Sequence, residues 1–143
     1  MGLARYIAAV FCAIGLRSTP KFSTAVERGR YGEDVAAWAL RRGGFKVLAR
    51  NWRSAAGEVD FICRHGRDLV FVEVKTRGQD SWIEPREAVN VQKQSRIAGA
   101  AQLYVQQLKL RDVPVRFDIV EVRVEPGTRP AFEIISNAYA ARR

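Results

Sequence analysis

The sequence predicts a single α/β domain in which a mixed β-sheet is flanked by helices, and three observations support this. The chain has 143 residues, 48% of them hydrophobic, which is enough for one domain with a buried core. Segments with a helical spacing of apolar residues alternate with short segments rich in β-branched residues. The predicted order is α-β-β-β-α-β-β, and helices that interrupt a run of strands favour packing on the faces of a mixed sheet.

The first helix is predicted to begin at Thr24 and to end at Gly43-Gly44. Thr24-Ala-Val-Glu27 has the pattern of a capping box, and the two glycines allow a left-handed helix end. Glu33 falls close to the apolar stripe of this helix, so its carboxylate either reaches solvent or points into a site. A first strand is predicted over residues 45–52.

The second half of the chain predicts one helix and two strands. Residues 78–86 are polar and predict a loop, and an apolar stripe then predicts a long helix over residues 87–110. Strands are predicted over 115–124 and 132–135, with Pro126-Gly127 as the turn between them.

The first 22 residues predict an N-terminal extension of uncertain structure ahead of a domain over residues 23–143. Residues 6–16 are apolar but fewer than the roughly 20 needed to span a bilayer, so no stable membrane insertion is expected. Three readings stay open for this run: an interfacial helix, a start codon placed too early, and, as the minority reading, a signal-peptide core without a clean cleavage site. We expect a cytoplasmic protein.

The most informative segment is a predicted hairpin over residues 57–77. Gly66-Arg67 fits a two-residue type II′ turn, so residues whose numbers sum to 133 should face each other. Asp60 then faces Glu73, and Glu58 faces Lys75, with all four on one face of the sheet. The other face is apolar and pairs Val59, Phe61 and Cys63 with Val74, Val72 and Val70.

Two directly opposed carboxylates destabilise a strand pair unless a cation lies between them. Mg²⁺ or Mn²⁺ suits Asp60 and Glu73, because hard cations prefer carboxylate oxygens and often take only one or two of them. Lys75 could orient or deprotonate an attacking water, or stabilise charge that develops on a phosphate. The segment therefore predicts metal-assisted hydrolysis of a phosphodiester. The alternative for the two acids is a solvated sheet end, or salt bridges to Lys75 and nearby arginines. The alternative for Lys75 is an ion pair with Glu58.

The charge of the chain indicates an anionic partner. Lys and Arg number 24 against 15 Asp and Glu, a formal net charge of +9, which favours nucleic acid first and a membrane surface second. Arg77 and Arg96 are candidate substrate-binding residues, with a strand end and a solvated helix face as the plain alternatives. Two cysteines and one histidine make neither a disulfide framework nor a zinc site.

The Asp60 and Glu73-Val74-Lys75 arrangement resembles the Asp…Glu-x-Lys core of restriction-endonuclease-like nucleases. A wider set of motifs, over roughly residues 24–140, resembles the bacterial YraN-type family, an uncharacterised family classed with endonucleases and similar to archaeal Holliday-junction resolvases. In chain order these motifs are Gly32-Glu33, Asn51-Trp52-Arg53, Gly57-Glu-Val-Asp60, Phe71-Val-Glu-Val-Lys-Thr-Arg77, Pro85 with Glu87-Ala88-Val89, Lys93 and Arg116-Phe117-Asp118. Trp82-Ile83 departs from the family, which commonly has an aromatic-Gly pair there.

The resemblance implies a restriction-endonuclease-like fold and a metal-dependent DNA endonuclease, selective for branched DNA and acting as a homodimer. It implies that Asp60, Glu73 and Glu33 form the metal site, that Lys75 is the catalytic lysine, and that Lys93 contacts substrate phosphate or assists the site. Glu58 either orients Lys75 or lies at the surface. Trp52 and Trp82 either stack on unpaired bases or pack internally. The alternative function is a nucleic-acid-binding module that keeps the fold but does not cleave.

Overall fold

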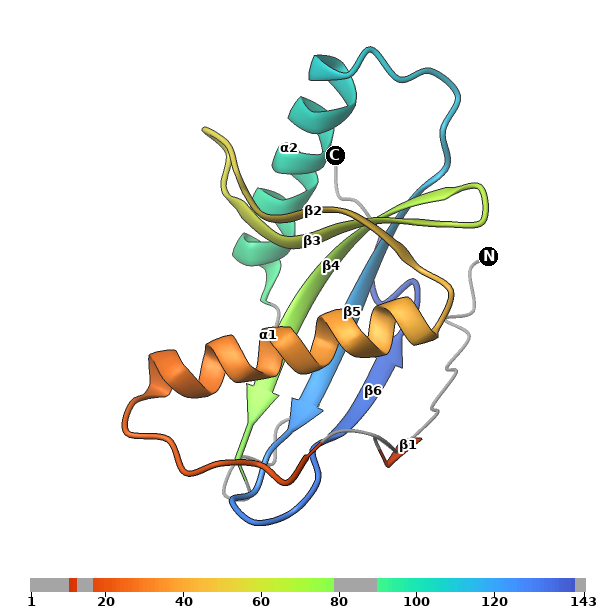
Figure 1. The fold of residues 1–143 in the computed structure, drawn as a ribbon. Coiled ribbons are helices and arrows are strands. Elements are labelled where there is room, and N and C mark those ends of the chain that lie inside the picture. The colour runs from red at the N-terminus through yellow and green to blue at the C-terminus, as the bar shows by residue number, and fades with distance from the viewer. Residues whose placement is uncertain (1–10, 13–16, 79–89, 141–143) are drawn as a thin grey trace.

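The computed structural model describes residues 11–12, 17–78 and 90–140, and within these ranges it contains two helices and six strands in one sheet (Figure 1). The elements are β1 (Phe11–Cys12), α1 (Ala25–Arg42), β2 (Lys46–Arg53), β3 (Glu58–His65), β4 (Asp68–Arg77), α2 (Val91–Gln107), β5 (Val115–Arg123) and β6 (Ala131–Ile135). The sheet order is β1-β6-β5-β4-β3-β2, with β4 and β5 parallel and the other neighbours antiparallel. The predicted mixed sheet and the α-β-β-β-α-β-β order, which β1 precedes, are confirmed.

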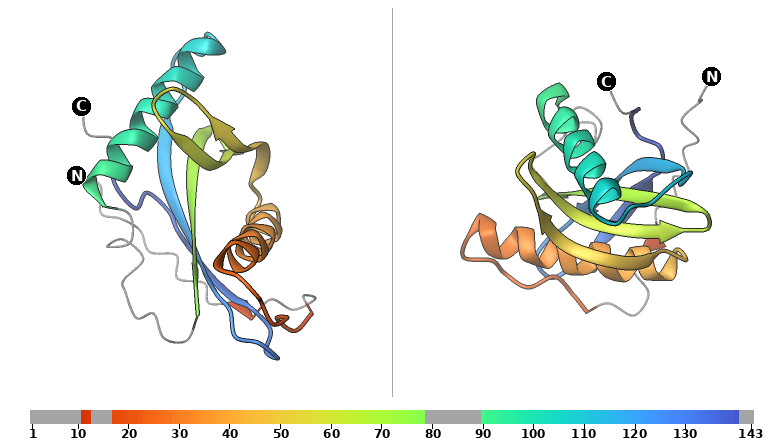
Figure 2. Two further views of the ribbon diagram at one scale, coloured as in Figure 1. Left: turned by 90° about the vertical axis from the view of Figure 1, so that its left-hand side faces the viewer. Right: turned by 90° about the horizontal axis from the view of Figure 1, so that it is seen from above.

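The two helices cover opposite faces of the sheet (Figure 2). Side chains alternate along β4, so Val70 and Val72 pack in the cluster under α1 while Leu69 and Phe71 pack in the cluster under α2. The central strands are therefore buried on both faces. Glu73 follows this alternation and lies on the α2 face, although it is only 4% exposed.

The helix ends explain where each helix begins and stops. Thr24 caps α1 by accepting a hydrogen bond from the Glu27 N–H, but the Glu27 carboxylate accepts from Ser23 rather than from Thr24, so the predicted capping box is shifted by one residue. Gly44 has φ +85°, which confirms the left-handed end. The second helix is shorter than predicted at its carboxyl end, because it stops at Gln107. Asn90 caps its start at Val91.

The β3–β4 hairpin has the predicted register, but the ladder opens before the predicted acid pair. Every recorded partner pair sums to 133, from His65↔Asp68 to Phe61↔Val72, where the recorded pairing ends. Val59 then packs in the α2-side cluster, not beside Phe61 as predicted. The point beyond Phe61 and Val72, where β3 and β4 separate, is here termed the fork. There the Asp60 carboxylate accepts a hydrogen bond of 2.8 Å from the Val74 N–H, so a side chain takes the place of a backbone acceptor.

The N-terminal segment contributes a strand that the sequence did not predict. Phe11 and Cys12 pair antiparallel with β6 at the edge of the sheet. The remaining residues of the apolar run, the predicted loop from residue 79 onward with Trp82 and Pro85, and residues 87–89 of the predicted helix lie outside the described residues. In the described part of the chain, neither helix is long and apolar enough to cross a membrane.

Helix α1 lies so close to β4 that one of its positions admits only glycine. A Cβ added to Gly32 would lie 1.7 Å from Thr76 Oγ1, whereas one added to Gly29 on the same helix would meet nothing within 4 Å. We predict that Gly32→Ala lowers the free energy of unfolding by about 2–4 kcal/mol through overpacking. Gly29→Ala should raise it by about 0.5–1 kcal/mol, because alanine favours the helix. Urea unfolding measures both, and equal effects would contradict the contact.

Candidate metal centre

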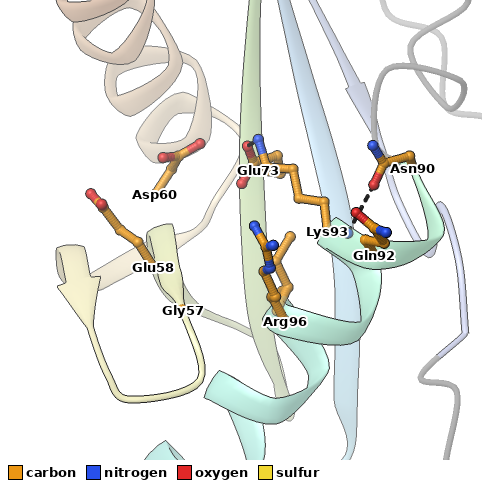
Figure 3. A pocket seen from close by; sticks show the side chains of 9 residues that line it. Gly57, Glu58, Asp60, Glu73, Asn90, Gln92, Lys93 and Arg96 are labelled. Atoms are coloured by element: carbon orange, nitrogen blue, oxygen red, sulfur yellow. Dashed lines mark hydrogen bonds and ion pairs between the residues drawn. The ribbon is translucent and has the colours of Figure 1, made fainter.

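A cavity of about 480 Å³ lies between the fork of β3 and β4 and the first turns of α2 (Figure 3). Its two walls have opposite charge. The strands supply the carboxylates Glu58, Asp60 and Glu73. The opposite wall supplies Asn90, Gln92, Lys93 and Arg96, of which the last two are cations. Such a cavity suits a ligand that combines a cation with an anion, as a metal-bound phosphate does.

Asp60 and Glu73 converge as the sequence predicted, although the strands that carry them have separated. Burial and the charge of Glu73 raise the pKa of Asp60 from its ordinary value of 3.8 to about 7, and a hydrogen bond between the two carboxylates acts in the same direction. The bond from the Val74 N–H and the charge of Lys93 oppose this rise in pKa. Burial and the neighbouring carboxylate therefore disfavour the charged form of Asp60.

Two lysines contact the Glu73 carboxylate, and they differ in their environment. Lys93 of α2 forms an ion pair with Glu73 Oε1, and Lys75 Nζ lies 4.0 Å from the same oxygen. Burial and the neighbouring Lys93 lower the pKa of Lys75. Burial favours neutral Lys93, but its hydrogen bond to Glu73 and the charges of Glu73 and Asp60 together outweigh burial and raise the pKa of Lys93. Lys75 is therefore the lysine that gives up its proton more readily.

Glu33 and Glu58 are two further acids near the Asp60–Glu73 pair, and neither contacts Lys75 or Lys93 in a recorded ion pair of the described residues. Burial raises the pKa of Glu33, and the charges of Asp60 and then Glu58 raise it further. Arg50 lies 3.7 Å from the Glu33 carboxylate. Glu58 forms its ion pair with Arg53, at 3.7 Å, and not with Lys75 as the alternative reading expected.

The remaining predicted residues separate into two groups. Arg96 lines the cavity and is exposed, as a phosphate ligand would be. Arg77 does not line it, and its buried Nε has no hydrogen-bond partner within the part of the chain that the structure describes. Trp52 packs edge-on against Tyr104 with ring centres 5.4 Å apart, which favours the packing reading over base stacking.

Asn90 and Gln92 are cavity residues that sequence reasoning missed. Gln92 has no motif or charge that singles it out. Asn90 carries a detectable signal, since asparagine is a preferred N-cap and a helical apolar pattern follows it.

The donor set fits a hard cation that keeps water and substrate ligands. Over the described ranges, no group of three or more Asp, Glu, His or Cys side chains is placed to hold a metal on its own. Asp60 and Glu73 supply carboxylate oxygens alone, and one or two carboxylates are what protein Mg²⁺ sites commonly provide. The absence of His and Cys from the cavity wall argues against a zinc site.

The raised pKa of Asp60 predicts a stability that falls with pH in the absence of divalent cations. Folded Asp60 holds its proton up to about pH 7 and the unfolded carboxyl only to about pH 4, so folding stability declines between these values. Asp60→Asn keeps the acceptor for the Val74 N–H and removes the charge. Its advantage over wild type should be smallest near pH 4 and reach the order of 4 kcal/mol at pH 8.

Urea unfolding at pH 4–8 with chelator measures this difference, with Asp112→Asn in an exposed loop as the matched control. A difference between Asp60→Asn and wild type that stays constant with pH would contradict the assignment of the raised pKa to Asp60.

The chain has relatives across bacteria. A family model described as uncharacterised protein family UPF0102 matches residues 32–122. A UPF0102 protein of Syntrophotalea carbinolica is 50% identical over 95 residues, which cover 66% of this chain and 77% of the relative. A UPF0102 protein of Symbiobacterium thermophilum is 44% identical over 113 residues, which cover 79% of this chain and 96% of the relative. A UPF0102 protein of Rhodococcus opacus is 41% identical over 111 residues, which cover 78% of this chain and 94% of the relative. The chain therefore belongs to the uncharacterised protein family UPF0102, the YraN-type family that its motifs resemble.

Proposed function

We propose that this protein is a Mg²⁺- or Mn²⁺-dependent endonuclease that hydrolyses DNA phosphodiesters, with branched DNA as the preferred substrate. The observation that carries the proposal is the convergence of Asp60 and Glu73 at the strand fork, opposite a cationic wall. A phosphodiester bound there would place its charged oxygens against Lys93 and Arg96. The preference for branched DNA follows from the likeness to junction resolvases and is the part that the substrate comparison below tests.

Asp60 and Glu73 would hold the metal, and Glu33 would add negative charge behind Asp60. The bound ion would supply Lewis-acid activation of the phosphate and a lower pKa for an attacking water. The proposal of such an ion rests on the placement of the charges, since both lysines contact Glu73 and Asp60 has no ion pair among the described residues.

Lys75 is not among the residues that line the cavity, but its Nζ lies 4.0 Å from Glu73 Oε1, and there it would handle the proton of the attacking water. Its lowered pKa increases the fraction of neutral amine, which can accept that proton as the oxygen attacks phosphorus. The phosphorus–oxygen bond to the leaving strand then breaks, and the departing oxygen takes a proton from solvent. In its charged form, Lys75 would instead stabilise the negative charge that builds on the phosphate.

Lys93 would change partners during the reaction. In the structure it is bound to Glu73, the carboxylate that a metal would also need. If Glu73 held a metal, Lys93 would be free to bind a substrate phosphate together with Arg96, which lines the same cavity. One cation thus replaces another at Glu73, and the site avoids two unpaired buried acids before substrate arrives.

A nucleic-acid-binding module without cleavage is the second candidate function. The specific observation in its favour is that Lys93 already neutralises Glu73, so the site is stable without a metal. The net charge of +9 suits either function.

Nuclease assays separate the two candidates. We predict metal-dependent cleavage of four-way-junction, nicked, linear or single-stranded DNA with Mg²⁺ or Mn²⁺, strongest on the junction, and none with chelator. Asp60→Asn, Glu73→Gln and Lys75→Met should each lower the rate about 100-fold or more. Asp112→Asn should cleave as wild type does. Cleavage that persists in all three site variants would remove the catalytic assignment, and binding without cleavage in any metal would support the module.

Competition at Glu73 predicts how metal affinity responds to Lys93. Lys93→Met removes the ammonium that occupies the carboxylate, so the variant should bind Mn²⁺ about tenfold more tightly than wild type. Glu73→Gln should bind it far more weakly, and Lys21→Met, at an exposed position, should bind as wild type does. Titration calorimetry with Mn²⁺ alone measures these affinities. Unchanged or weaker binding by Lys93→Met would show that the lysine does not compete.

A further inference from the structure

Exposed cations gather around the β3–β4 turn, at the opposite end of the hairpin from the acid pair. We propose that Arg41, Lys46, Arg64 and Arg67, here termed the basic end, form a second phosphate-binding surface that grips the backbone of a nucleic acid. This inference rests on the proposed function in one respect, namely that the ligand is a nucleic acid; it does not require cleavage. Figure 1 shows the turn at the edge of the molecule, away from α2.

The strongest observation is a like-charged pair in the sheet. Lys46 of β2 lies directly opposite Arg64 of β3, and both side chains are exposed. Directly opposed like charges destabilise a strand pair, so this position lowers the stability of the β2–β3 pair unless an anion lies over it. Arg67 adds a third exposed cation at the turn itself, and Arg64 Nε hydrogen-bonds the Gly66 carbonyl at 3.3 Å.

The carboxylates near the turn pair with another cation. Asp68 and Asp118 both bind Arg116, at 2.8 and 2.9 Å, and this group of one cation and two acids keeps a net charge of −1 against the four cations of the basic end. Within the ranges that the structure describes, the four cations of the basic end form no ion pair with a carboxylate. Their charge is therefore available to a ligand.

Helix-dipole stabilisation explains only part of this charge. Arg41 lies in the last turn of α1, where a cation is favourable without any ligand. Lys46, Arg64 and Arg67 lie on strands and a turn, so the dipole does not account for them. Arginine is also the side chain whose planar fork matches phosphate oxygens.

The turn that carries these cations is firmly held. His65 stacks on Phe45 with ring centres 4.0 Å apart, and Arg116 joins the start of β4 to β5 through its two acids. A surface that is already ordered loses little conformational entropy when it binds.

The spacing of the two surfaces indicates a ligand longer than the cavity. Six residues of extended strand separate Arg67 from Glu73, which is about 20 Å at 3.3 Å per residue. A nucleic-acid duplex covers that distance in about six base pairs. The basic end would therefore anchor the polymer while the cavity holds the phosphate that reacts.

A pair of charge-matched variants tests the proposal. Lys46→Gln/Arg64→Gln/Arg67→Gln removes three charges from the basic end, and Lys21→Gln/Arg111→Gln/Arg129→Gln removes three exposed charges elsewhere. Binding of a 30-base-pair duplex is measured by fluorescence anisotropy with chelator, at several salt concentrations, so cleavage is not needed. The first variant should bind at least tenfold more weakly than the second, with a salt dependence lower by about three in slope. Equal loss in both would overturn the proposal.

A single substitution separates binding from folding. Lys46→Glu replaces the like-charged pair with an ion pair to Arg64, so we expect a higher melting temperature together with weaker duplex binding. A variant that is more stable yet binds duplex as tightly as wild type would overturn the proposal.

Two further outcomes bear on the ligand itself. If wild type binds no nucleic acid, the proposed function fails together with this inference; if wild type binds and cleaves DNA while the basic-end variant binds equally well, only this inference fails. Flotation with anionic phospholipid vesicles that depends on the same three cations, in a protein that does not bind duplex, would assign the surface to a membrane instead.

Discussion

The repulsion between Asp60 and Glu73 is the constraint on which the rest of this structure depends. The hairpin register brings both acids to one point, and the ladder opens there so that the Asp60 carboxylate takes the Val74 N–H. Helix α2 then reaches the fork and places Lys93 on Glu73. A cavity with acids on one wall and cations on the other is the result. The surrounding fold tolerates this local cost because β4 is packed on both faces and paired along its length to β5.

The same hairpin carries like charges at both of its ends, and this organisation connects the proposed chemistry with the proposed binding surface. Acids converge where β3 leaves β4, and cations converge where the two strands meet at the turn. Neither arrangement helps folding, since each adds repulsion to a strand pair. A nucleic acid with its bound metal cations would relieve both repulsions, because it brings positive ions to the acidic side chains and phosphate oxygens to the lysine and arginine side chains.

Much of this arrangement was predictable from sequence, and the exceptions have physical reasons. The Gly66-Arg67 turn determines the hairpin register, and alternation along β4 places Glu73 on the α2 face with Leu69 and Phe71. The positions of Val59 and Glu58 were wrong because pattern rules assume an intact ladder and do not foresee a side chain that takes a backbone bond. The contact of Lys93 with Glu73 depends on how α2 packs across the sheet, which sequence spacing does not encode. The pairing of β1 with β6 is equally long-range.

Strand β2 forms one border of the sheet, and its composition has a consequence for self-association. An outermost strand offers free backbone groups to a second copy, and proteins commonly prevent that pairing with charges and bulges. β2 carries Lys46, Arg50 and Arg53, and its register shifts between Val47 and Ala49. Two β2 edge strands brought side by side would repel each other through these cations, and the bulge would disturb their backbone pairing. A homodimer, if the chain forms one, would therefore not be built by pairing the β2 strand of one copy with the β2 strand of the other.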